Sequence, residues 1–150
     1  MQIRLITILL AAGSLIPAAD GAKVWTSADL KALEQKMSAK QEKVTTASLA
    51  VFSNYLMEVT HRTASGEAEL HLAKNDIFYV LSGDATLVTG GTIAGKHGTA
   101  PNEFRGPSIT GGEKHKIGPG DWLTIPAGIP HKVLLEPATE FTYVVVKVNK

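Results

Sequence analysis

Residues 120–131, which read GDWLTIPAGIPH, decide the fold class of this chain. Residues 122–125 within this stretch are mostly apolar or β-branched and predict a short strand. The following Pro126, Ala127 and Gly128 predict a tight turn, because proline fixes φ and glycine tolerates unusual backbone angles. His131 then begins another apolar segment. The stretch therefore predicts two strands with a tight turn between them and an imidazole where the second strand starts.

The same pattern recurs along most of the chain. Segments rich in Val, Ile, Leu, Tyr, Phe and Thr alternate with turn signals, and they occupy residues 49–60, 68–72, 77–81, 85–89, 115–117, 122–125, 132–135 and 141–148. Many short strands at such spacing predict an all-β sandwich or barrel. The sequence shows no internal repeat of fixed period, so a tandem of two domains is not expected.

Two histidines and two carboxylates stand in strongly patterned positions. Glu69 and His71 are separated by one residue, so on a strand both point to the same face. A turn at residues 73–75 lets Asp76 begin the next strand on the same wall, where His131 is also expected. Such a group inside a small barrel suits a divalent first-row metal such as Fe, Mn, Ni or Zn. It would leave coordination positions open for water or substrate, as a catalytic metal site requires.

At these residues the chain resembles the cupin superfamily. The second motif of the family sets a Gly, a Pro-x-Gly turn and a His in fixed spacing before a final Asn. Gly120, Pro126, Gly128 and His131 stand in register with it, and Leu135 stands at the Asn position.

The first cupin motif is matched less fully. The family has a Gly, a His-x-His pair, a Glu and a last Gly in this order. His71 stands at the second His, Asp76 at the Glu and Gly83 at the last Gly. Glu69 replaces the first His, and Thr63 replaces the opening Gly. The altered positions bear on function more than on fold.

The resemblance covers residues 49–148 and implies a single cupin, or jelly-roll, β-barrel. It further implies a metal held by His71, His131, Asp76 and Glu69. Asp76 is one methylene shorter than Glu, so it either falls short of the ion or binds through water. Glu69 in place of a histidine favours harder ions and weakens the case for copper. Alternatively, Glu69 or Asp76 stays unligated as a catalytic general base, with its pKa raised by burial and by the other carboxylate.

The remaining histidines and three aromatic residues are not expected to take part in the site. His61, His97 and His115 are expected to be solvated, and Arg105 is a minor candidate for gripping an anionic ligand. Three aromatic side chains are expected to lie in the core rather than to form a substrate platform: Tyr55, Phe78 and Trp122.

The chain divides into three segments. Residues 1–19 predict a cleavable secretory signal, with Arg4 before an apolar run too short to span a bilayer and Pro17 at its end. Residues 20–46 are expected to hold one amphipathic helix, from Val24 to about Lys43, and residues 47–150 the barrel. The protein is therefore expected to be periplasmic or secreted, with no membrane contact in its mature form.

Residues 90–118 are rich in glycine and hold few large apolar side chains. Connections of this length are uncommon and are usually functional or mobile. The stretch is interpreted as an irregular excursion with one hairpin near Thr110. The alternative is a flap over the mouth of a pocket, and the role of the stretch stays open.

Composition excludes several classes of function. The chain has no cysteine, which excludes disulfide scaffolds, thiolate metal sites and cysteine nucleophiles. Lysine and arginine number 15 against 14 acidic residues, and the net charge of +1 without a basic cluster argues against a nucleic-acid partner.

Three functions are compatible with these observations. The first is an exported, metal-dependent cupin that acts on a small organic molecule with oxygenase, isomerase or lyase chemistry. The second is a small-molecule sensor or carrier without a catalytic metal, which the altered first motif favours. The third and weakest is an interaction protein, and the family resemblance also suggests a homodimer. Fold alone does not decide between them.

Overall fold

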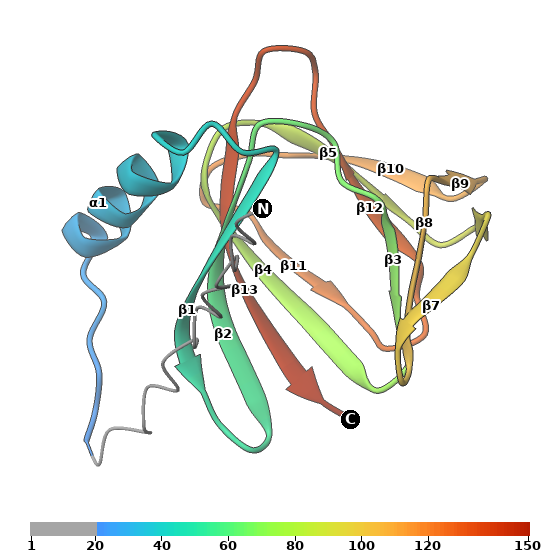
Figure 1. Cartoon of the computed structure of the whole chain (residues 1–150), viewed down its shortest axis with the longest axis horizontal. Helices are drawn as coiled ribbons and strands as arrows, with labels where there is room; N and C mark the ends of the chain where they lie inside the picture. The colour runs from blue at the N-terminus through green and yellow to red at the C-terminus, as the bar shows by residue number, and fades with distance from the viewer. Residues whose placement is uncertain (1–20) are drawn as a thin grey trace, which may run out of the picture.

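A computed structural model describes residues 21–150, which form two large antiparallel β-sheets facing each other and one helix outside them (Figure 1). The five-stranded sheet has the order β1 (Val44–Val51), β2 (Tyr55–Arg62), β13 (Phe141–Asn149), β4 (Lys74–Ser82) and β11 (Trp122–Ile125). The six-stranded sheet has the order β10 (Glu113–Ile117), β5 (Ala85–Thr89), β12 (His131–Leu134), β3 (Ala68–His71), β8 (Glu103–Gly106) and β7 (His97–Ala100). A two-stranded sheet pairs β6 (Thr92–Ala94) with β9 (Ser108–Thr110).

The prediction of a mostly β chain with one helix is confirmed, but the sheets are not closed into a barrel. Within residues 21–150 no strand of one large sheet pairs with a strand of the other. The reason lies at the corners, where the chain leaves one sheet for the other in sharp turns that end the ladder. Gly83 and Gly120 in two of these turns have φ of +75° and +89°, which side-chain-bearing residues rarely adopt.

The main core fills the space between the two large sheets. Strands β4, β11 and β13 supply its aromatic and aliphatic side chains from one sheet, and β5, β10 and β12 supply those of the other. Because side chains alternate along a strand, every second residue of these segments faces inward. The buried members of this cluster are Phe78, Val80, Ala85, Leu87, Ile117, Ile125, Val133, Phe141, Tyr143 and Val145.

Helix α1 (Ser27–Ser38) covers the outer face of the five-stranded sheet. It begins at Ser27 because Thr26 and Asp29 form a reciprocal capping box. It ends well before the predicted Lys43, and Gln41 beyond it takes a left-handed φ of 54°. Met37 is its buried anchor and packs with Leu49, Val59 and Val144 of the sheet.

Two strand boundaries differ from the prediction. The segment 49–60 is a hairpin of two strands, β1 and β2, rather than one strand. The turn predicted at residues 73–75 ends earlier than expected, because β4 begins at Lys74 and Asp76 lies inside the ladder, paired with Lys147 and Ile125. The chain reverses more tightly than expected, so Asp76 is held by a strand instead of a loop.

The prediction of an irregular excursion over residues 90–118 is wrong as well. This stretch forms the strands β6, β7, β8, β9 and β10. The β6–β9 pair packs outside β3, where Ile93 is buried against Ala68 and Leu70. Strand β8 pairs with β3 along its whole length and so extends the six-stranded sheet. The glycine-rich stretch is therefore regular because Ile93 packs on β3 and because β8 pairs with the edge of β3.

His61 and Trp122 contradict the expected exposure of their side chains. His61 is buried beneath α1, where its Nδ1 lies 2.9 Å from Oγ1 of Thr142. Trp122 is 68% exposed and rests on Tyr79, with the two ring centroids 4.7 Å apart. Both side chains lie on the outer face of the five-stranded sheet. Helix α1 covers this face at β2, so His61 is buried, whereas it leaves the edge strand β11 uncovered, so Trp122 is exposed.

The predicted secretory signal lies outside the described residues. Over residues 21–150, no helix has both the length and the apolar character that crossing a membrane requires.

Candidate metal centre

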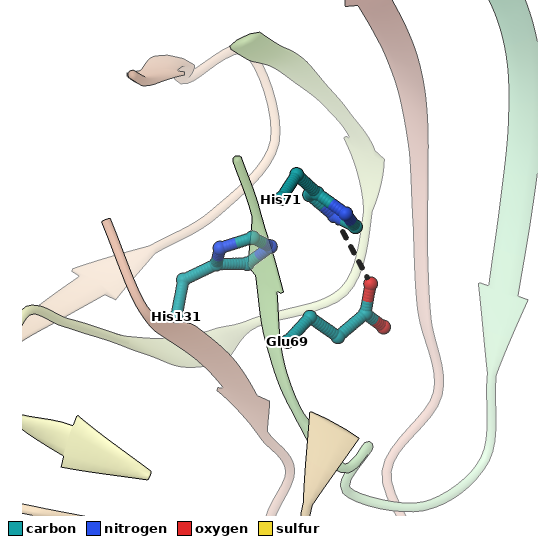
Figure 2. A group of neighbouring side chains, drawn as sticks. All are labelled: Glu69, His71 and His131. Atoms are coloured by element: carbon teal, nitrogen blue, oxygen red, sulfur yellow. Dashed lines mark ion pairs between the residues drawn. The ribbon is translucent and has the colours of Figure 1, made fainter. Parts of the chain in front are cut away.

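Glu69, His71 and His131 bring ligand atoms together at one end of the space between the sheets. Strand alternation places Glu69 and His71 of β3 on one face, and His131 of β12 is paired directly with Glu69. One carboxylate oxygen and one ring nitrogen from each histidine all lie within 4.8 Å of one another (Figure 2). Both histidines are buried, with exposures of 6% and 3%. These positions come from the two segments that sequence analysis singled out.

Both imidazole rings are held through Nδ1 and turn Nε2 toward the centre. His131 Nδ1 lies 3.2 Å from the backbone oxygen of Ile129, and His71 Nδ1 is hydrogen-bonded to the carboxylate of Glu103. An acceptor at one ring nitrogen fixes the tautomer and leaves the other nitrogen for a metal. Carboxylate–imidazole pairs of the His71–Glu103 kind are the usual support of metal-binding histidines.

Asp76 reaches the same centre from the opposite sheet. Its Oδ2 lies 3.4 Å from His71 Nε2 and 3.6 Å from His131 Nε2. It falls outside the compact group of Glu69, His71 and His131. Its other oxygen, Oδ1, is buried and finds no hydrogen-bond partner among the described residues. A buried carboxylate oxygen without a donor is costly, so this atom is suited to a cation.

Lys147 is a member of the centre that sequence analysis missed. It lies opposite Asp76 in the β13–β4 ladder, and its Nζ is 3.0 Å from Asp76 Oδ2. The same Nζ is 3.3 Å from His71 Nε2. The ammonium group therefore lies among the side chains predicted to hold the metal.

Glu69 is engaged by two guanidinium groups. Arg105 of β8 donates from Nη1 to Glu69 Oε1 at 2.9 Å, and Arg62 of β2 lies 3.6 Å from the same oxygen. Its other oxygen lies 3.4 Å from His71 Nε2. Arg105 was a minor candidate for gripping an anionic ligand, and the anion that it contacts within the chain is Glu69.

The two imidazoles have opposite tendencies to bind a proton. Burial lowers the pKa of His71, but hydrogen bonds to Asp76 and Glu69 outweigh it and raise the pKa to about 9. Burial lowers the pKa of His131, and the nearby carboxylates offset this only in part. His131 is therefore neutral at pH 7 with a free Nε2, whereas metal binding at His71 must displace a proton.

The carboxylates differ from expectation, because their pKa values are lowered. Burial raises the pKa of Glu69, but the hydrogen bond to His71 and the charge of Arg105 outweigh it. Burial likewise raises the pKa of Asp76, and His71 and Lys147 outweigh it. Both are therefore ionised and suited to ligation. At Glu58 of β2 the net shift is the opposite, because burial raises the pKa of this carboxyl group by more than the charge of Lys147 lowers it.

The centre leaves little free space between its side chains. The cavity bounded by Glu69, Asp76, His131 and Lys147 measures about 20 Å³, which is room for a single water molecule or ion. A larger cavity of about 370 Å³ lies elsewhere, lined by residues such as Asp84, Lys116 and Glu136, and none of the candidate ligands borders it. The small cavity is therefore the one that adjoins the candidate ligands.

Other histidines do not join the centre. His97 of β7 is exposed, as predicted, and His115 is 39% exposed with its Nε2 lying 3.1 Å from Thr89 Oγ1.

The described residues fit a divalent metal. Two imidazole nitrogens aimed at one point, ionised carboxylates beside them and an unpartnered carboxylate oxygen together make a donor set for a first-row metal ion. The ammonium group of Lys147 is a cation that already lies among these donors.

No protein-family model matches the chain, and no curated protein does. Solved structures do. A cupin superfamily protein from Desulfitobacterium hafniense is 15% identical with a TM-score of 0.51, over 73% of this chain and 80% of its own. A protein from Thermotoga maritima described as a "predicted oxalate decarboxylase" is 16% identical with a TM-score of 0.53, over 71% and 81%. The polyketide cyclase RemF from Streptomyces resistomycificus is 20% identical with a TM-score of 0.51, over 71% and 66%.

These similarities show that the chain has the cupin fold, which confirms the resemblance noted in its motifs. At identities of 15% to 20% they show the fold alone. Proteins with this architecture include enzymes, and the chain carries a His and Glu group able to hold a metal.

Proposed function

We propose that this protein is a metal-binding cupin that acts on a small organic molecule. The observation that carries the proposal is the convergence of Glu69, His71 and His131 within 4.8 Å. The free Nε2 of His131, the fixed Nδ1 atoms of both imidazoles and the unpartnered Oδ1 of Asp76 support it. The metal is a divalent ion such as Fe, Mn, Ni or Zn, which suits a mixed nitrogen and oxygen donor set.

A bound metal would supply Lewis-acid activation of a substrate oxygen or of water, or redox chemistry, depending on its identity. His71 and His131 would hold the metal through their Nε2 atoms, and Glu69 would offer a carboxylate from the same sheet. Asp76 completes the set directly or through a water molecule. Either carboxylate that stays unligated is ionised, but its lowered pKa makes it a weaker general base than the catalytic role predicted for both requires. Oxygenase, isomerase and lyase reactions stay open.

Elemental analysis of purified protein tests the proposal. We expect one stoichiometric transition metal, or uptake of one by metal-free protein, and loss of that metal in His71→Ala and in His131→Ala. His97→Ala removes an exposed imidazole on β7 and should leave metal content unchanged. Protein that neither carries nor takes up Fe, Mn, Ni or Zn would overturn the proposal.

A second function, a small-molecule sensor or carrier without a catalytic metal, is favoured by one observation. The carboxylates of the centre already meet cations of the chain, with Arg105 on Glu69 and Lys147 on Asp76. A thermal-shift screen of small molecules separates the two functions. Stabilisation of metal-free protein by ligands but not by metals would favour the carrier.

We further propose that the protein is exported to the periplasm or secreted, and that it forms a homodimer. The apolar run before Pro17 supports export. Mass spectrometry of protein from its native host should find an N-terminus near residue 20. Light scattering on the purified protein should give twice the mass of one chain. An intact Met1 on protein from the cytoplasm would contradict export. The mass of a single chain would contradict the homodimer.

A further inference from the structure

Lys147 lies where a second cation would face strong repulsion. Its Nζ is 3.0 Å from Asp76 Oδ2 and 3.3 Å from His71 Nε2, two of the atoms that would hold the metal. In a partly dehydrated site, an ammonium group so close to the atoms that would hold a divalent ion repels that ion strongly.

Lys147 is fixed in this place by the fold. It is paired with Asp76 in the β13–β4 ladder, so the two side chains leave the sheet on the same face and beside each other. Its side chain is 17% exposed and that of Asp76 is 1% exposed. The pair is therefore an enclosed ion pair, not a mobile surface contact.

We propose that Lys147 is a built-in cation that occupies the metal centre in the metal-free protein and must withdraw before a metal ion binds. The inference rests on the proposed function, because it assumes the same donor set. It adds that the chain sets its own metal affinity: the ammonium group neutralises Asp76 when the metal is absent and competes with the metal for it. The protein should therefore bind metal more weakly than its donor set alone would allow.

The structure also offers a place to which the ammonium group can withdraw. Glu58 of β2 lies diagonal to Lys147 in the β13–β2 ladder, in which Lys147 is paired with Leu56 and Val145 with Glu58. Diagonal neighbours on one face of a sheet are within reach of a long side chain. Lys147 can thus exchange Asp76 for Glu58 and keep a carboxylate partner.

Metal titration of a Lys147 series tests this inference. Lys147→Met removes the charge while keeping an unbranched side chain, and Lys147→Arg keeps the charge. Lys114→Met is the matched control, since it removes one positive charge at an exposed position of β10. Affinity for Zn²⁺ and Mn²⁺ is measured by competition with a chromophoric chelator, and the midpoint of thermal unfolding is recorded with and without metal.

We expect Lys147→Met to bind metal at least about tenfold more tightly than the wild type, a change worth about 1.4 kcal/mol. Lys147→Arg should bind no more tightly than the wild type, and Lys114→Met should match it. Lys147→Met should also be less stable than the wild type without metal and gain more from metal, because the buried Asp76 then loses its ammonium partner. The rise in the unfolding midpoint on adding metal still tests the inference if the metal-free variant folds poorly.

The outcomes separate the two proposals. If Lys147→Met binds metal and the wild type binds none, the inference holds and the proposed metal-dependent function fails. If both bind with equal affinity, or the variant binds more weakly, the inference is overturned and the metal-dependent function stands. If neither binds any metal, both are overturned.

Discussion

His71 and Glu103 face each other across the β3–β8 ladder, and the carboxylate of Glu103 accepts the Nδ1 hydrogen of His71. Lys74 holds the other oxygen of Glu103 at 2.9 Å. Glu103 thereby orients the ring of His71 through Nδ1, the nitrogen that faces away from the centre, although it lies 32 positions further along the chain. Metal affinity should consequently depend on a residue that does not touch the metal.

Glu103→Gln should weaken metal binding about 10- to 100-fold, which is the usual effect of removing the partner of a metal-binding imidazole. The amide lacks the negative charge that makes His71 a better ligand. Competition titration measures the affinity. The matched control is Glu113→Gln on β10, whose side chain is 79% exposed. Equal affinities of Glu103→Gln and wild type would show that Glu103 does not support the ligand.

The metal-free protein should lose stability as the pH rises from about 6.5 to about 9. The pKa of His71 is raised from 6.5 to about 9, so the folded chain binds this proton more tightly than the unfolded chain. A raised pKa contributes stability that is complete below the unfolded value and disappears as the pH rises through the folded one. Urea unfolding at several pH values, with a chelator present, measures the slope.

His71→Gln is the control for this pH dependence. It removes the titrating group and should give a flatter profile between pH 6.5 and 9, whatever its absolute stability. A wild-type free energy of unfolding that stays constant or increases over this interval would contradict the assignment.

Glu69, His71 and His131 could be predicted from the sequence, because local rules of strands and turns fix where they lie. Glu69 and His71 share a face because side chains alternate along a strand, and this needs no knowledge of the fold. His131 follows a turn whose proline and glycine are readable in the sequence. The expected rise in the pKa of Glu69 and Asp76 was wrong, because local rules do not show which cations the fold places beside them.

The rest of the centre depends on pairing between distant segments. Glu103 and Arg105 reach the centre because β8 pairs with β3, and nothing in a glycine-rich stretch indicates that partner. Lys147 lies in β13, which is covered by the core on one face and by helix α1 on the other. Such a strand is apolar on both faces, so its sequence gives no alternation from which the direction of Lys147 could be inferred. A lone lysine in this apolar run was the available signal.

Helix α1 should depend on Glu34 for its attachment to the sheet. Glu34 Oε1 accepts hydrogen bonds from Thr142 at 2.8 Å and from Ser82, and Thr142 in turn faces the buried ring of His61. Glu34→Ala should lower the free energy of unfolding by about 1–3 kcal/mol, because it leaves a buried hydroxyl without its acceptor. Chemical unfolding measures the loss.

Gln35→Ala is the matched control for Glu34→Ala, since Gln35 is the next, exposed position of the same helix. Metal affinity should not change in either variant, because the helix lies on the face of the sheet away from the centre. Equal stability of the two variants would show that these hydrogen bonds contribute nothing to the attachment.

Gly83 and Gly128 are both cupin-motif glycines with positive φ, at +75° and +87°, yet alanine should affect them very differently. At Gly128 a Cβ would meet no atom within 4 Å, so Gly128→Ala should cost only the backbone strain of about 1–2 kcal/mol. At Gly83 a Cβ would lie 2.0 Å from the backbone oxygen of Glu140, a contact that cannot form. Gly83→Ala must therefore move the start of β13, and it should cost more than about 4 kcal/mol or prevent folding. Urea unfolding of the two variants side by side measures the difference. A Gly83→Ala protein as stable as Gly128→Ala would mean that the corner between β4 and β13 can open, and that this close approach does not fix the strand that carries Lys147.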